Sequence, residues 1–287
     1  MQIGLVGAGL MGHGIALNLL KGGHAVSVVA HRNPAPVEDL VQRGATKAAS
    51  LGELAERAEV IVTCVTNSKA VQEVIASLKP HLKAGQVILD MGTSDPAVNR
   101  GLAAELGKQG VAFAEAPVMG GPEQAAAAEL GALVGADLET LPRITLALEC
   151  TCATISHVGP VGAGQTAKLI SNYLTLGMAA LIADSFNVAR KAGIDWEKLY
   201  AVMLRGSGNS GALRKIVEPA LQGNYDGHAF SLANAHKDMS YYSALAGEGG
   251  FRSRLADEVL AVYDKAVADG HGDRRVSRLI DPELNRD

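Results

Sequence analysis

Short apolar runs alternate with amphipathic segments along the first half of the chain. Apolar runs of this length are typical of buried strands, and the segments between them have the period of helices. The predicted strands are residues 3–6, 25–30, 60–65, 87–89 and 111–114, and the predicted helices are 15–20, 37–43, one from residue 51 and one from residue 68. This alternation predicts an α/β fold with a mostly parallel, doubly wound, Rossmann-like sheet and helices on both faces.

Two polar residues mark where later helices begin. Ser68 is the predicted N-cap of a helix that Pro80 and Gly85 end, and Asp95 with Pro96 predicts the cap and first turn of the next one. A capping side chain accepts a hydrogen bond from a free N–H group of the first turn. Both helices therefore have predicted starting points.

The pattern changes near residue 159. Glycines and a proline at 159–164 form a short connector, and no strand pattern follows it. The predicted helices of this second half are 165–191, 196–204, 213–221, 232–246 and 255–268. We therefore predict a Rossmann-like domain of residues 1–161 and an all-helical domain of residues 162–287. Because so small a domain cannot cover a long apolar helix, we expect a homodimer or homotetramer that forms through the C-terminal helices.

The first predicted strand leads into glycines at G-x-G-x-x-G spacing, which are Gly7, Gly9 and Gly12. Gly7 allows a tight turn, Gly9 leaves the backbone open to a pyrophosphate, and Gly12 lets the next helix pack closely on the strand. Leu10 and Met11 lie between these glycines, and the free N–H groups at the start of the following helix would bind the phosphates. The strand, the turn and the helix together predict a dinucleotide site that these five residues form.

Ligands of doubly wound sheets bind beyond the carboxyl ends of the strands, so the residues at these ends are candidates for the site. They are His31, Arg32, Asn33, Val65, Thr66, Asn67, residues 90–93, which include Thr93, and residues 116–121. An acidic residue about 20 positions after the glycines would bind the ribose of NAD, but His31 and Arg32 take that place. Because a guanidinium can bind a 2′-phosphate and no carboxylate repels it, the sequence favours NADP over NAD. Alternatively, Arg32 only stacks on the adenine of either cofactor.

Three polar residues lie on one face of the long apolar helix. Lys168 and Asn172 are four residues apart, and Gln165 lies one turn earlier. A lysine at the start of an apolar helix could simply extend its ammonium group to solvent. A partly desolvated ammonium between two domains could instead have a lowered pKa and exchange a proton with a substrate oxygen, while the amide orients the substrate.

Composition and charge exclude several classes of protein. The chain has 287 residues, of which 48% are hydrophobic and 20% charged, and its net charge is −4. These values predict a globular protein that binds no nucleic acid. No secretory signal and no uncharged run long enough to span a bilayer are apparent, so we expect a cytoplasmic protein without a membrane partner. Cys64, Cys150 and Cys152 have the wrong spacing for a zinc site, and we expect no metal.

Several stretches of the sequence, in this order, resemble one known family. They are residues 4–12 (GLVGAGLMG), 90–96 (DMGTSDP), 116–121 (APVMGG), 162–172 and 230–238. Together these motifs resemble the β-hydroxyacid dehydrogenases, which include 3-hydroxyisobutyrate dehydrogenase and tartronate semialdehyde reductase, over essentially the whole chain. The resemblance implies that hydride passes between a nicotinamide cofactor and a small carboxylate substrate that bears a hydroxyl or aldehyde group.

The resemblance also implies roles for individual residues. Lys168 matches the catalytic acid/base of the family, and Asn172 matches an asparagine that helps to hold the substrate. Thr93 matches a site residue beside the nicotinamide, so it belongs to both the cofactor and the substrate sites. Lys237 matches a second lysine that closes over substrate and cofactor.

Three positions depart from the family pattern. Gly120 and Gly121 match a loop whose backbone amides receive the substrate carboxylate, but Met119 stands before them where a serine is usual. Gly92 and Ser171 stand where the family commonly has serine and asparagine. A thioether cannot replace a hydroxyl donor, so these positions leave the identity of the acid open.

We therefore expect an NADP-preferring oxidoreductase that acts on a small 3-hydroxy acid or its semialdehyde, with the active site between the two domains. One alternative is an imine reductase of the same fold, against which Lys168 argues because those enzymes usually lack the lysine. The other alternative is a non-catalytic nucleotide-binding regulatory protein. Loss of Lys168 or Asn172 would favour that alternative, and both residues are present.

Overall fold

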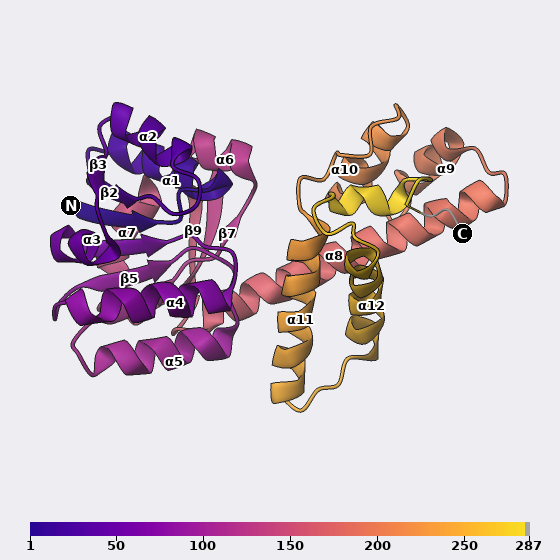
Figure 1. The fold of residues 1–287 in the computed structure, drawn as a ribbon. Coiled ribbons are helices and arrows are strands. Elements are labelled where there is room, and N and C mark those ends of the chain that lie inside the picture. Colours follow the sequence, from indigo (N-terminus) through magenta and orange to yellow (C-terminus); the bar gives the residue numbers. More distant parts are fainter. Residues whose placement is uncertain (285–287) are drawn as a thin grey trace. The chain divides into compact units, whose positions relative to one another are not determined.

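The computed structural model describes residues 1–284, and the chain divides into two compact units, Met1–Lys168 and Leu169–Asp287. The first unit contains all the strands that the structure describes (Figure 1). They are β1 (Gln2–Val6), β2 (Ala25–Val29), β3 (Thr46–Ala48), β4 (Val60–Thr63), β5 (Val87–Asp90), β6 (Ala112–Glu115), β7 (Val118–Met119), β8 (Leu130–Gly135) and β9 (Cys152–Gly159). The helices of this unit are α1 (Leu10–Lys21), α2 (Ala35–Gln42), α3 (Leu51–Arg57), α4 (Ser68–Leu78), the 3₁₀ turn η1 (Lys79–His81), α5 (Pro96–Gly107), α6 (Pro122–Ala127) and α7 (Leu141–Glu149).

The strands of the first unit form one sheet in the order β3-β2-β1-β4-β5-β6-β8-β7, and β9 pairs with β8. All neighbours from β3 to β6 are parallel, whereas β8 runs antiparallel to β6 and β7. The strand order reverses its direction between β1 and β4, which is the switch point of a doubly wound sheet. This topology confirms the predicted Rossmann-like fold.

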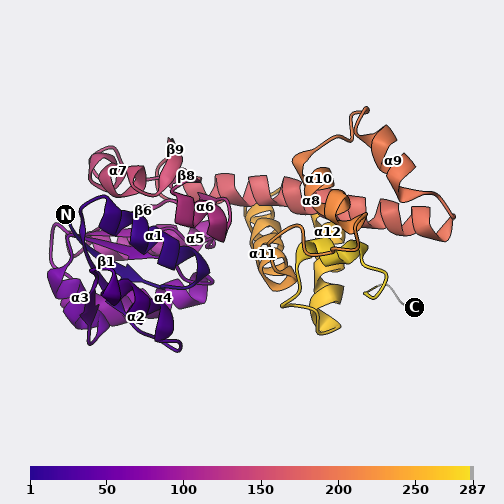
Figure 2. The ribbon, with the colours of Figure 1, turned by 90° about the horizontal axis from the view of Figure 1, so that it is seen from above.

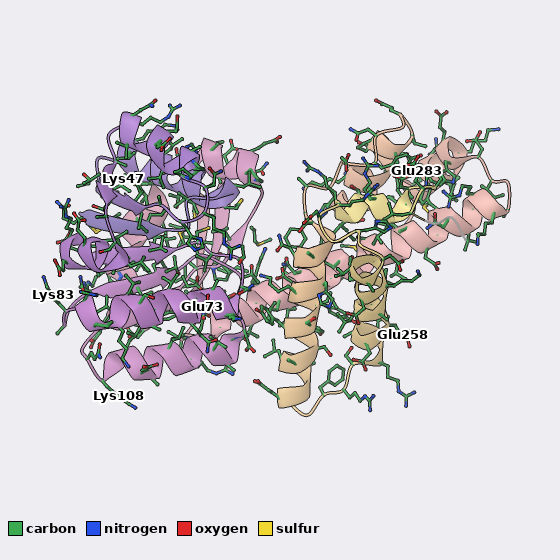
Figure 3. The ribbon with its side chains drawn as sticks, in the orientation of Figure 1. Lys47, Glu73, Lys83, Lys108, Glu258 and Glu283 are labelled. Carbon is green, nitrogen blue, oxygen red and sulfur yellow. The ribbon has the colours of Figure 1, made fainter. Side chains whose placement is uncertain are left out.

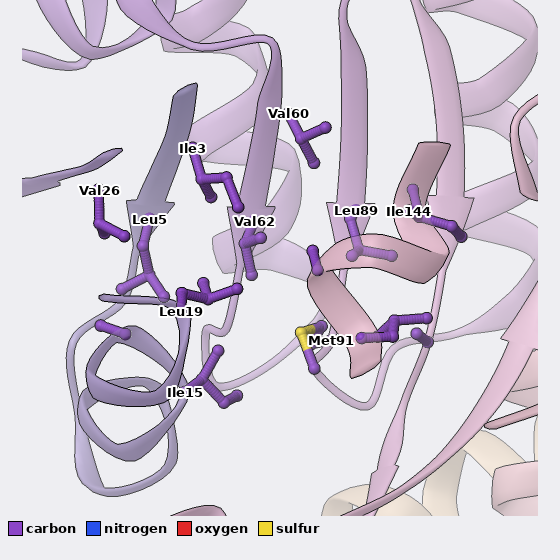
Figure 4. Packing of buried hydrophobic residues seen from close by; sticks show 14 of the residues in the cluster. Ile3, Leu5, Ile15, Leu19, Val26, Val60, Val62, Leu89, Met91 and Ile144 are labelled. Carbon is purple, nitrogen blue, oxygen red and sulfur yellow. The ribbon is translucent and has the colours of Figure 1, made fainter. Parts of the chain in front are cut away.

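Helices cover both faces of this sheet. On one face, Ile15 and Leu19 of α1 pack against strand residues such as Leu5 and Val62, as Figure 4 shows. Helices α2, α6 and α7 complete that layer, and α3, α4 and α5 bury their apolar sides in a separate cluster against the other face. The strands are therefore apolar on both sides, which is why they appear in the sequence as continuous apolar runs.

The second unit is built from helices. Helix α8 (Ala163–Lys191) begins in the first unit and continues into the second, which also contains α9 (Trp196–Met203), α10 (Gly211–Ala220), α11 (Leu232–Glu248), α12 (Arg254–Ala268) and the 3₁₀ turn η2 (Val276–Ile280). Leu176 and Phe186 of α8 form the core of this unit with residues such as Met239 of α11 and Tyr263 of α12. The predicted all-helical half is therefore confirmed.

By length and composition alone, α8 is the one helix in the described part of the chain that could cross a membrane. Core helices of soluble proteins pass the same test, so the observation is weak evidence for a membrane. The helix buries Ala179 and Ala183 in the core of the second unit, while Leu174, Leu181 and Val188 are exposed. One side of α8 thus packs within its own unit, and another side remains apolar at the surface.

Charged side chains lie on the surface of both units. Figure 3 shows Lys47, Lys83 and Lys108 at the outside of the first unit and Glu258 at the outside of the second, and all four are exposed. This distribution agrees with the near-neutral net charge of the chain.

The sequence analysis did not predict several elements of the first unit, most of them near its end. These are the short strands β3 and β7, strands β8 and β9, and helices α6 and α7, of which α7, β8 and β9 lie together at one edge of the sheet (Figure 2). Most residues of β9 are exposed, and β8 begins and ends with glycine-containing segments. Neither strand therefore has the continuous apolar run on which the predictions rested.

One predicted helix cap was wrong. The N-cap of α4 is Asn67, whose Oδ1 accepts a hydrogen bond from the Ala70 N–H at 2.9 Å, and not Ser68. The hydroxyl of Ser68 is engaged elsewhere, because it accepts a hydrogen bond from the Asp95 N–H at 2.8 Å. Asp95 itself caps α5 as predicted, with its Oδ1 2.8 Å from the Ala97 nitrogen.

Candidate active site

The glycines of the turn between β1 and α1 serve two different needs. Gly7 has a φ of +101°, and a side chain there would overlap the carbonyl oxygen of Cys64. A Cβ at Gly12 would overlap the carbonyl oxygen of Gly7, so α1 reaches the turn only because residue 12 has no side chain. At Gly9, apart from its chain neighbours, no atom of the described residues lies within 4 Å of where a Cβ would be. Two glycines therefore allow close packing, and the third leaves the backbone open.

The first turn of α1 begins beside this open space. Gly9 is the N-cap, and within residues 1–284 no side chain caps the helix there. Leu10 is 83% exposed, and Met11 is partly buried. The free N–H groups of such a turn and the positive end of the helix dipole favour a phosphate. An uncapped helix start next to an open glycine therefore fits the pyrophosphate of a dinucleotide.

Basic and polar residues follow the carboxyl end of β2. His31, Arg32 and Asn33 are all exposed, and Asn33 Oδ1 accepts a hydrogen bond from the Ala35 N–H at 3.1 Å. Asn33 thus shapes the turn into α2. His31 and Arg32 leave this end of β2 with a guanidinium and an imidazole where a carboxylate would favour NAD.

Helix α2, which follows this turn, carries a paired carboxylate. Asp39 Oδ2 accepts hydrogen bonds from Arg43 Nε and from His13 Nε2, each at 2.8 Å. These bonds, from Arg43 first and His13 second, hold the pKa of Asp39 below its ordinary value. Asp39 is therefore ionised and links α2 to α1.

The end of β4 lies beside the glycine turn, because β1 and β4 are neighbours in the sheet. Val65 is partly buried there and Thr66 is exposed. Burial, with a smaller contribution from the charge of Asp90, raises the pKa of the Cys64 thiol to about 12. This thiol therefore stays protonated and is no nucleophile. Within residues 1–284, no group of three or more His, Cys, Asp or Glu side chains could hold a metal ion.

The end of β5 is fixed by a buried carboxyl group. Asp90 Oδ1 accepts hydrogen bonds from Thr63 Oγ1 at 2.9 Å and from the Gly92 N–H at 3.2 Å, and its Oδ2 accepts one from Ser94 Oγ at 3.0 Å. Asp90 is fully buried, and burial raises its pKa. These bonds hold the loop that carries Thr93, which is itself partly exposed.

A second buried carboxyl group ends β6. Glu115 Oε1 accepts hydrogen bonds from the Gly162 N–H at 2.8 Å and the Gln165 N–H at 2.9 Å, so this side chain caps the start of α8. Asn99 Nδ2 donates to Glu115 Oε2 at 2.9 Å and to Asp90 Oδ2 at 3.3 Å, and joins the two carboxyl groups. Burial raises the pKa of Glu115 as well. Asn99 Oδ1 is buried and has no hydrogen-bond partner among the described residues.

The amide of Gln165 connects α8 to the loop after β5. Its Nε2 donates to the Gly92 carbonyl oxygen at 2.9 Å, and its Oε1 accepts from the Ser94 N–H at 3.0 Å. These two bonds hold the peptide groups on both sides of Thr93. Lys168, which is partly buried, follows Gln165 by three residues on the same side of α8.

Met119 and its neighbours form the end of the short strand β7. Met119 is 42% exposed, and Gly120 has a φ of +115°, which only glycine adopts without strain. The Gly121 N–H donates to Gln124 Oε1 at 2.9 Å, so this amide is already engaged within its own turn. The predicted carboxylate loop is therefore exposed, with one of its two amides used locally.

In the second unit, Asn172, Lys237 and Asp238 lie together. Asn172 Nδ2 donates to Asp238 Oδ2 at 2.6 Å, and Lys237 Nζ forms an ion pair with Asp238 Oδ1 at 3.1 Å. Lys237 Nζ also lies 5.5 Å from the centre of the Tyr241 ring. Asp238 is 2% exposed. It orients both residues that the sequence predicts to hold the substrate.

The sequence did not single out the residues that hold the predicted site residues in place. Glu115 and Asp238 were missed because each acts on a partner far away in the sequence, and Asn99 was missed because it joins the ends of two different strands. A signal did exist for Glu115, because a carboxyl group directly after the apolar run 111–114 must be buried or lie at a strand end. For Asp238 the only signal was its place beside Lys237 in a family motif.

Comparison with known proteins shows which family this is. A sequence model described as the NAD binding domain of 6-phosphogluconate dehydrogenase matches residues 2–159. A second, described as NAD-binding of NADP-dependent 3-hydroxyisobutyrate dehydrogenase, matches residues 162–282. A probable 3-hydroxyisobutyrate dehydrogenase from Dictyostelium discoideum is 30% identical over 97% of this chain and 89% of its own length. The chain belongs to the β-hydroxyacid dehydrogenase family.

Two further relatives of this family show how far the similarity extends. An NAD-dependent L-serine dehydrogenase from Pseudomonas aeruginosa is 29% identical over 98% of both chains. The structure of a 3-hydroxyisobutyrate dehydrogenase from Mycobacterium tuberculosis with L-serine superimposes with a TM-score of 0.90, at 27% identity and with 99% of both chains covered. As a β-hydroxyacid dehydrogenase, the protein is an NAD(P)-dependent oxidoreductase, and both halves of the predicted fold are confirmed. The preference for NADP, the substrate and the role of Lys168 stay predictions.

Proposed function

We propose that this enzyme transfers a hydride between NADP(H) and a small 3-hydroxy acid or its semialdehyde, with Lys168 as the general acid/base. One observation carries the proposal. Lys168 follows Gln165 by one helical turn, and the amide of Gln165 binds the backbone on both sides of Thr93. The amine and the threonine are the two groups that the family motifs assign to the reacting end of the substrate and to the nicotinamide.

In this reaction the residues of the chain must transfer a proton and position the substrate. A bound nicotinamide supplies the hydride for reduction or accepts it in oxidation. In oxidation, neutral Lys168 takes the proton of the substrate hydroxyl at Nζ. In reduction, the ammonium form returns that proton to the carbonyl oxygen. Asn172, oriented by Asp238, holds the same oxygen or its neighbour through its amide.

The proposed preference for NADP rests on the exposed pair that follows β2. Arg32 can bind a 2′-phosphate through two N–H groups, and His31 occupies the place of the carboxylate that would repel it. One family model that matches this chain describes NADP-dependent enzymes, whereas the Pseudomonas aeruginosa relative is NAD-dependent. The family therefore includes both choices, and the residues after β2 favour NADP.

The proposed substrate class follows from Met119. Where a hydroxyl side chain is usual before Gly120, this chain presents an exposed thioether, which donates no hydrogen bond. An acid with an apolar substituent beside its carboxylate, such as 3-hydroxyisobutyrate, therefore suits the loop better than one with a charged substituent, such as L-serine.

The variant Lys168→Ala tests the proposal. We expect kcat to fall about 10²- to 10⁴-fold, the usual contribution of an acid/base group, while the affinity for NADPH is nearly unchanged. Turnover is followed by NADPH absorbance with a panel of semialdehydes and hydroxy acids. Added primary amines should restore part of the activity, because they can replace the missing proton carrier.

A lysine at the other end of the same helix provides the control. Lys191→Ala, in the last turn of α8, should leave kcat unchanged. Wild-type activity in Lys168→Ala would contradict the acid/base role. Tight binding of NADPH by the wild-type protein without turnover of any substrate in the panel would instead favour a regulatory protein.

A further inference from the structure

Gln165 occupies a position where one side chain spans two parts of the candidate site. It is fully buried and lies in the first turn of α8. Its amide donates at one end to the Gly92 carbonyl oxygen and accepts at the other end from the Ser94 N–H. The amide thus pairs with the backbone before and after Thr93 in the way that a neighbouring strand would.

The loop that Gln165 holds is also fixed from the side of the sheet. Asp90 accepts hydrogen bonds from the Gly92 N–H and from the hydroxyl of Ser94. Gly92 and Ser94 therefore each have one bond to β5 and one to α8. With its two neighbours fixed in this way, Thr93 has little freedom to move relative to α8.

The helix that carries Gln165 is fixed as well. Glu115 caps its first turn through the N–H groups of Gly162 and Gln165. A side chain at Gly164 would overlap the carbonyl oxygen of Leu133 on β8, so the helix start touches the backbone of the sheet. The first turn of α8 is therefore a rigid part of the first unit, and it holds the backbone of Gln165 in a fixed position relative to the sheet.

We propose that Gln165 is a positioning residue that sets the separation between Thr93 and Lys168. This inference rests on the proposed function, in which Lys168 exchanges a proton with a substrate beside the nicotinamide. Lys168 lies one turn after Gln165, so the two bonds of the amide determine where the lysine stands relative to Thr93. A carboxamide suits this position because it offers a donor and an acceptor in one plane.

The variant Gln165→Leu removes both bonds and keeps a side chain of similar size. We expect kcat to fall about 10- to 100-fold, because a misplacement of about 1 Å at a reacting group can cost about that much. The affinity for NADPH, measured by fluorescence titration, should be nearly unchanged. Wild-type kcat in this variant would overturn the proposal.

The variant Gln165→Glu gives a test that a merely structural role would not pass. The introduced carboxyl group, when protonated, donates to the Gly92 carbonyl oxygen and accepts from the Ser94 N–H, as the amide does. When ionised it has no donor and places a negative charge against that carbonyl oxygen. The ratio of kcat in the variant to kcat in the wild type should therefore fall as the pH rises, by about tenfold or more between pH 6 and pH 9. A ratio that is independent of pH would overturn the proposal.

The other charged groups near the side chain of residue 165 are the same in the wild type and in Gln165→Glu. They are Asp90 at the end of β5, Glu115 at the end of β6, Lys168 on the same helix, and Arg100 of α5, whose side chain lies against Gly162. Because both proteins carry all four groups, a pH dependence of the ratio comes from the introduced carboxyl group, either directly or through the effect of its charge on these neighbours.

Gln86 provides a matched control at the amino ends of the strands, on the side of the sheet opposite to the candidate site. It directly precedes β5, is buried, and also uses both ends of its amide on the backbone. Its Nε2 donates to the carbonyl oxygens of Ala55 and Ala58, and its Oε1 accepts from the Lys83 N–H. Gln86→Glu should lower the stability of the protein without making the ratio of kcat values depend on pH.

The outcomes separate this inference from the proposed function. If Lys168→Ala remains active, the proposed function is wrong. If Lys168→Ala is inactive while Gln165→Leu has the wild-type kcat, Lys168 keeps its role and only the positioning role of Gln165 is wrong. If Gln165→Leu does not fold, the pH profile of Gln165→Glu decides, because its protonated form keeps both hydrogen bonds.

Discussion

The carboxyl ends of the strands in the first unit form two regions, one at β1 and β4 and one at β5 and β6. These two halves are built in different ways. At the ends of β1 and β4, the turn packs closely because Gly7 and Gly12 have no side chains, and Gly9 leaves the backbone open to a ligand. At the ends of β5 and β6, the structure depends on side chains, since Asp90 and Glu115 are buried and bind Thr63 and the start of α8, respectively, far away in the sequence. The first half is governed by space, and the second by hydrogen bonds and charge. Mutations should therefore act through sterics in one half and through lost bonds or altered proton uptake in the other.

The largest effect is expected where space is tightest. In Gly12→Ala, the new Cβ overlaps the Gly7 carbonyl oxygen, and the turn or the helix must shift. We expect the free energy of unfolding in urea to fall by about 1–3 kcal/mol or more and the binding of NADPH to be largely lost.

Gly9→Ala sharpens this prediction, because its Cβ would enter open space. Its stability should change by no more than about 0.5 kcal/mol, while calorimetry should show weaker binding of NADPH, since the methyl group occupies the approach of the pyrophosphate. Equal losses of stability in the two variants would contradict the division between packing and access.

In the second half, at the ends of β5 and β6, the corresponding test changes the charge of a buried side chain, Glu115. Because burial raises the pKa of Glu115, the folded protein holds a proton more tightly here than the unfolded chain does. The stability that this group contributes is present below pH 4.5, which is its ordinary pKa. It is lost as the pH rises through the raised pKa that Glu115 has in the folded protein. For each unit by which folding raises this pKa, the rise in pH removes about 1.4 kcal/mol of the free energy of unfolding.

The variant Glu115→Gln removes this titration and keeps the shape of the side chain. The difference in unfolding free energy between wild type and variant should shift in favour of the variant as the pH rises from 4.5 to 8, as urea unfolding would measure. Carboxyl groups with lowered pKa values, such as Asp137 and Asp226, are present in both proteins and cancel in the difference. A difference that does not change with pH would show that Glu115 titrates as it does in the unfolded chain.

The smallest change concerns the choice of cofactor. In His31→Asp, a carboxylate at the end of β2 would bind the ribose hydroxyl of NAD and repel a 2′-phosphate. We expect the ratio of kcat/KM for NADP to that for NAD to fall about tenfold, which corresponds to about 1.4 kcal/mol. The isosteric variant His31→Asn, which adds no charge, should shift the ratio less, and an unaltered ratio in His31→Asp would refute the account of selectivity.

The same division explains what the sequence could predict. The strand, glycine turn and helix of residues 2–21 are continuous in the chain, and their pattern alone predicts the fold. The cap at Ser68 was wrong because the choice between it and Asn67 depends on Asp95, whose N–H binds the serine hydroxyl. No local pattern contains that contact.

The candidate site was predicted unevenly for the same reason. Lys168, Asn172 and Thr93 could be named from motifs, and Gln165 from its place on the helix face, but the other residues that hold them could not. Glu115 binds N–H groups almost fifty positions later, and Asp238 binds Asn172 across 66 positions. A single sequence contains no signal for such pairs, because hydrophobic period and spacing describe only neighbours along the chain.

No donor from the described residues contacts the buried carbonyl oxygen of the Asn99 side chain. Asn99 Nδ2 already serves Asp90 and Glu115, so this oxygen is a spare acceptor next to two groups whose pKa values are raised. A half-turn of the amide would withdraw Nδ2 from both carboxyl groups and turn the oxygen toward the one that is still ionised. One remaining carboxylate is therefore enough to fix the orientation of Asn99, so the link between Asp90 and Glu115 survives the uptake of a single proton.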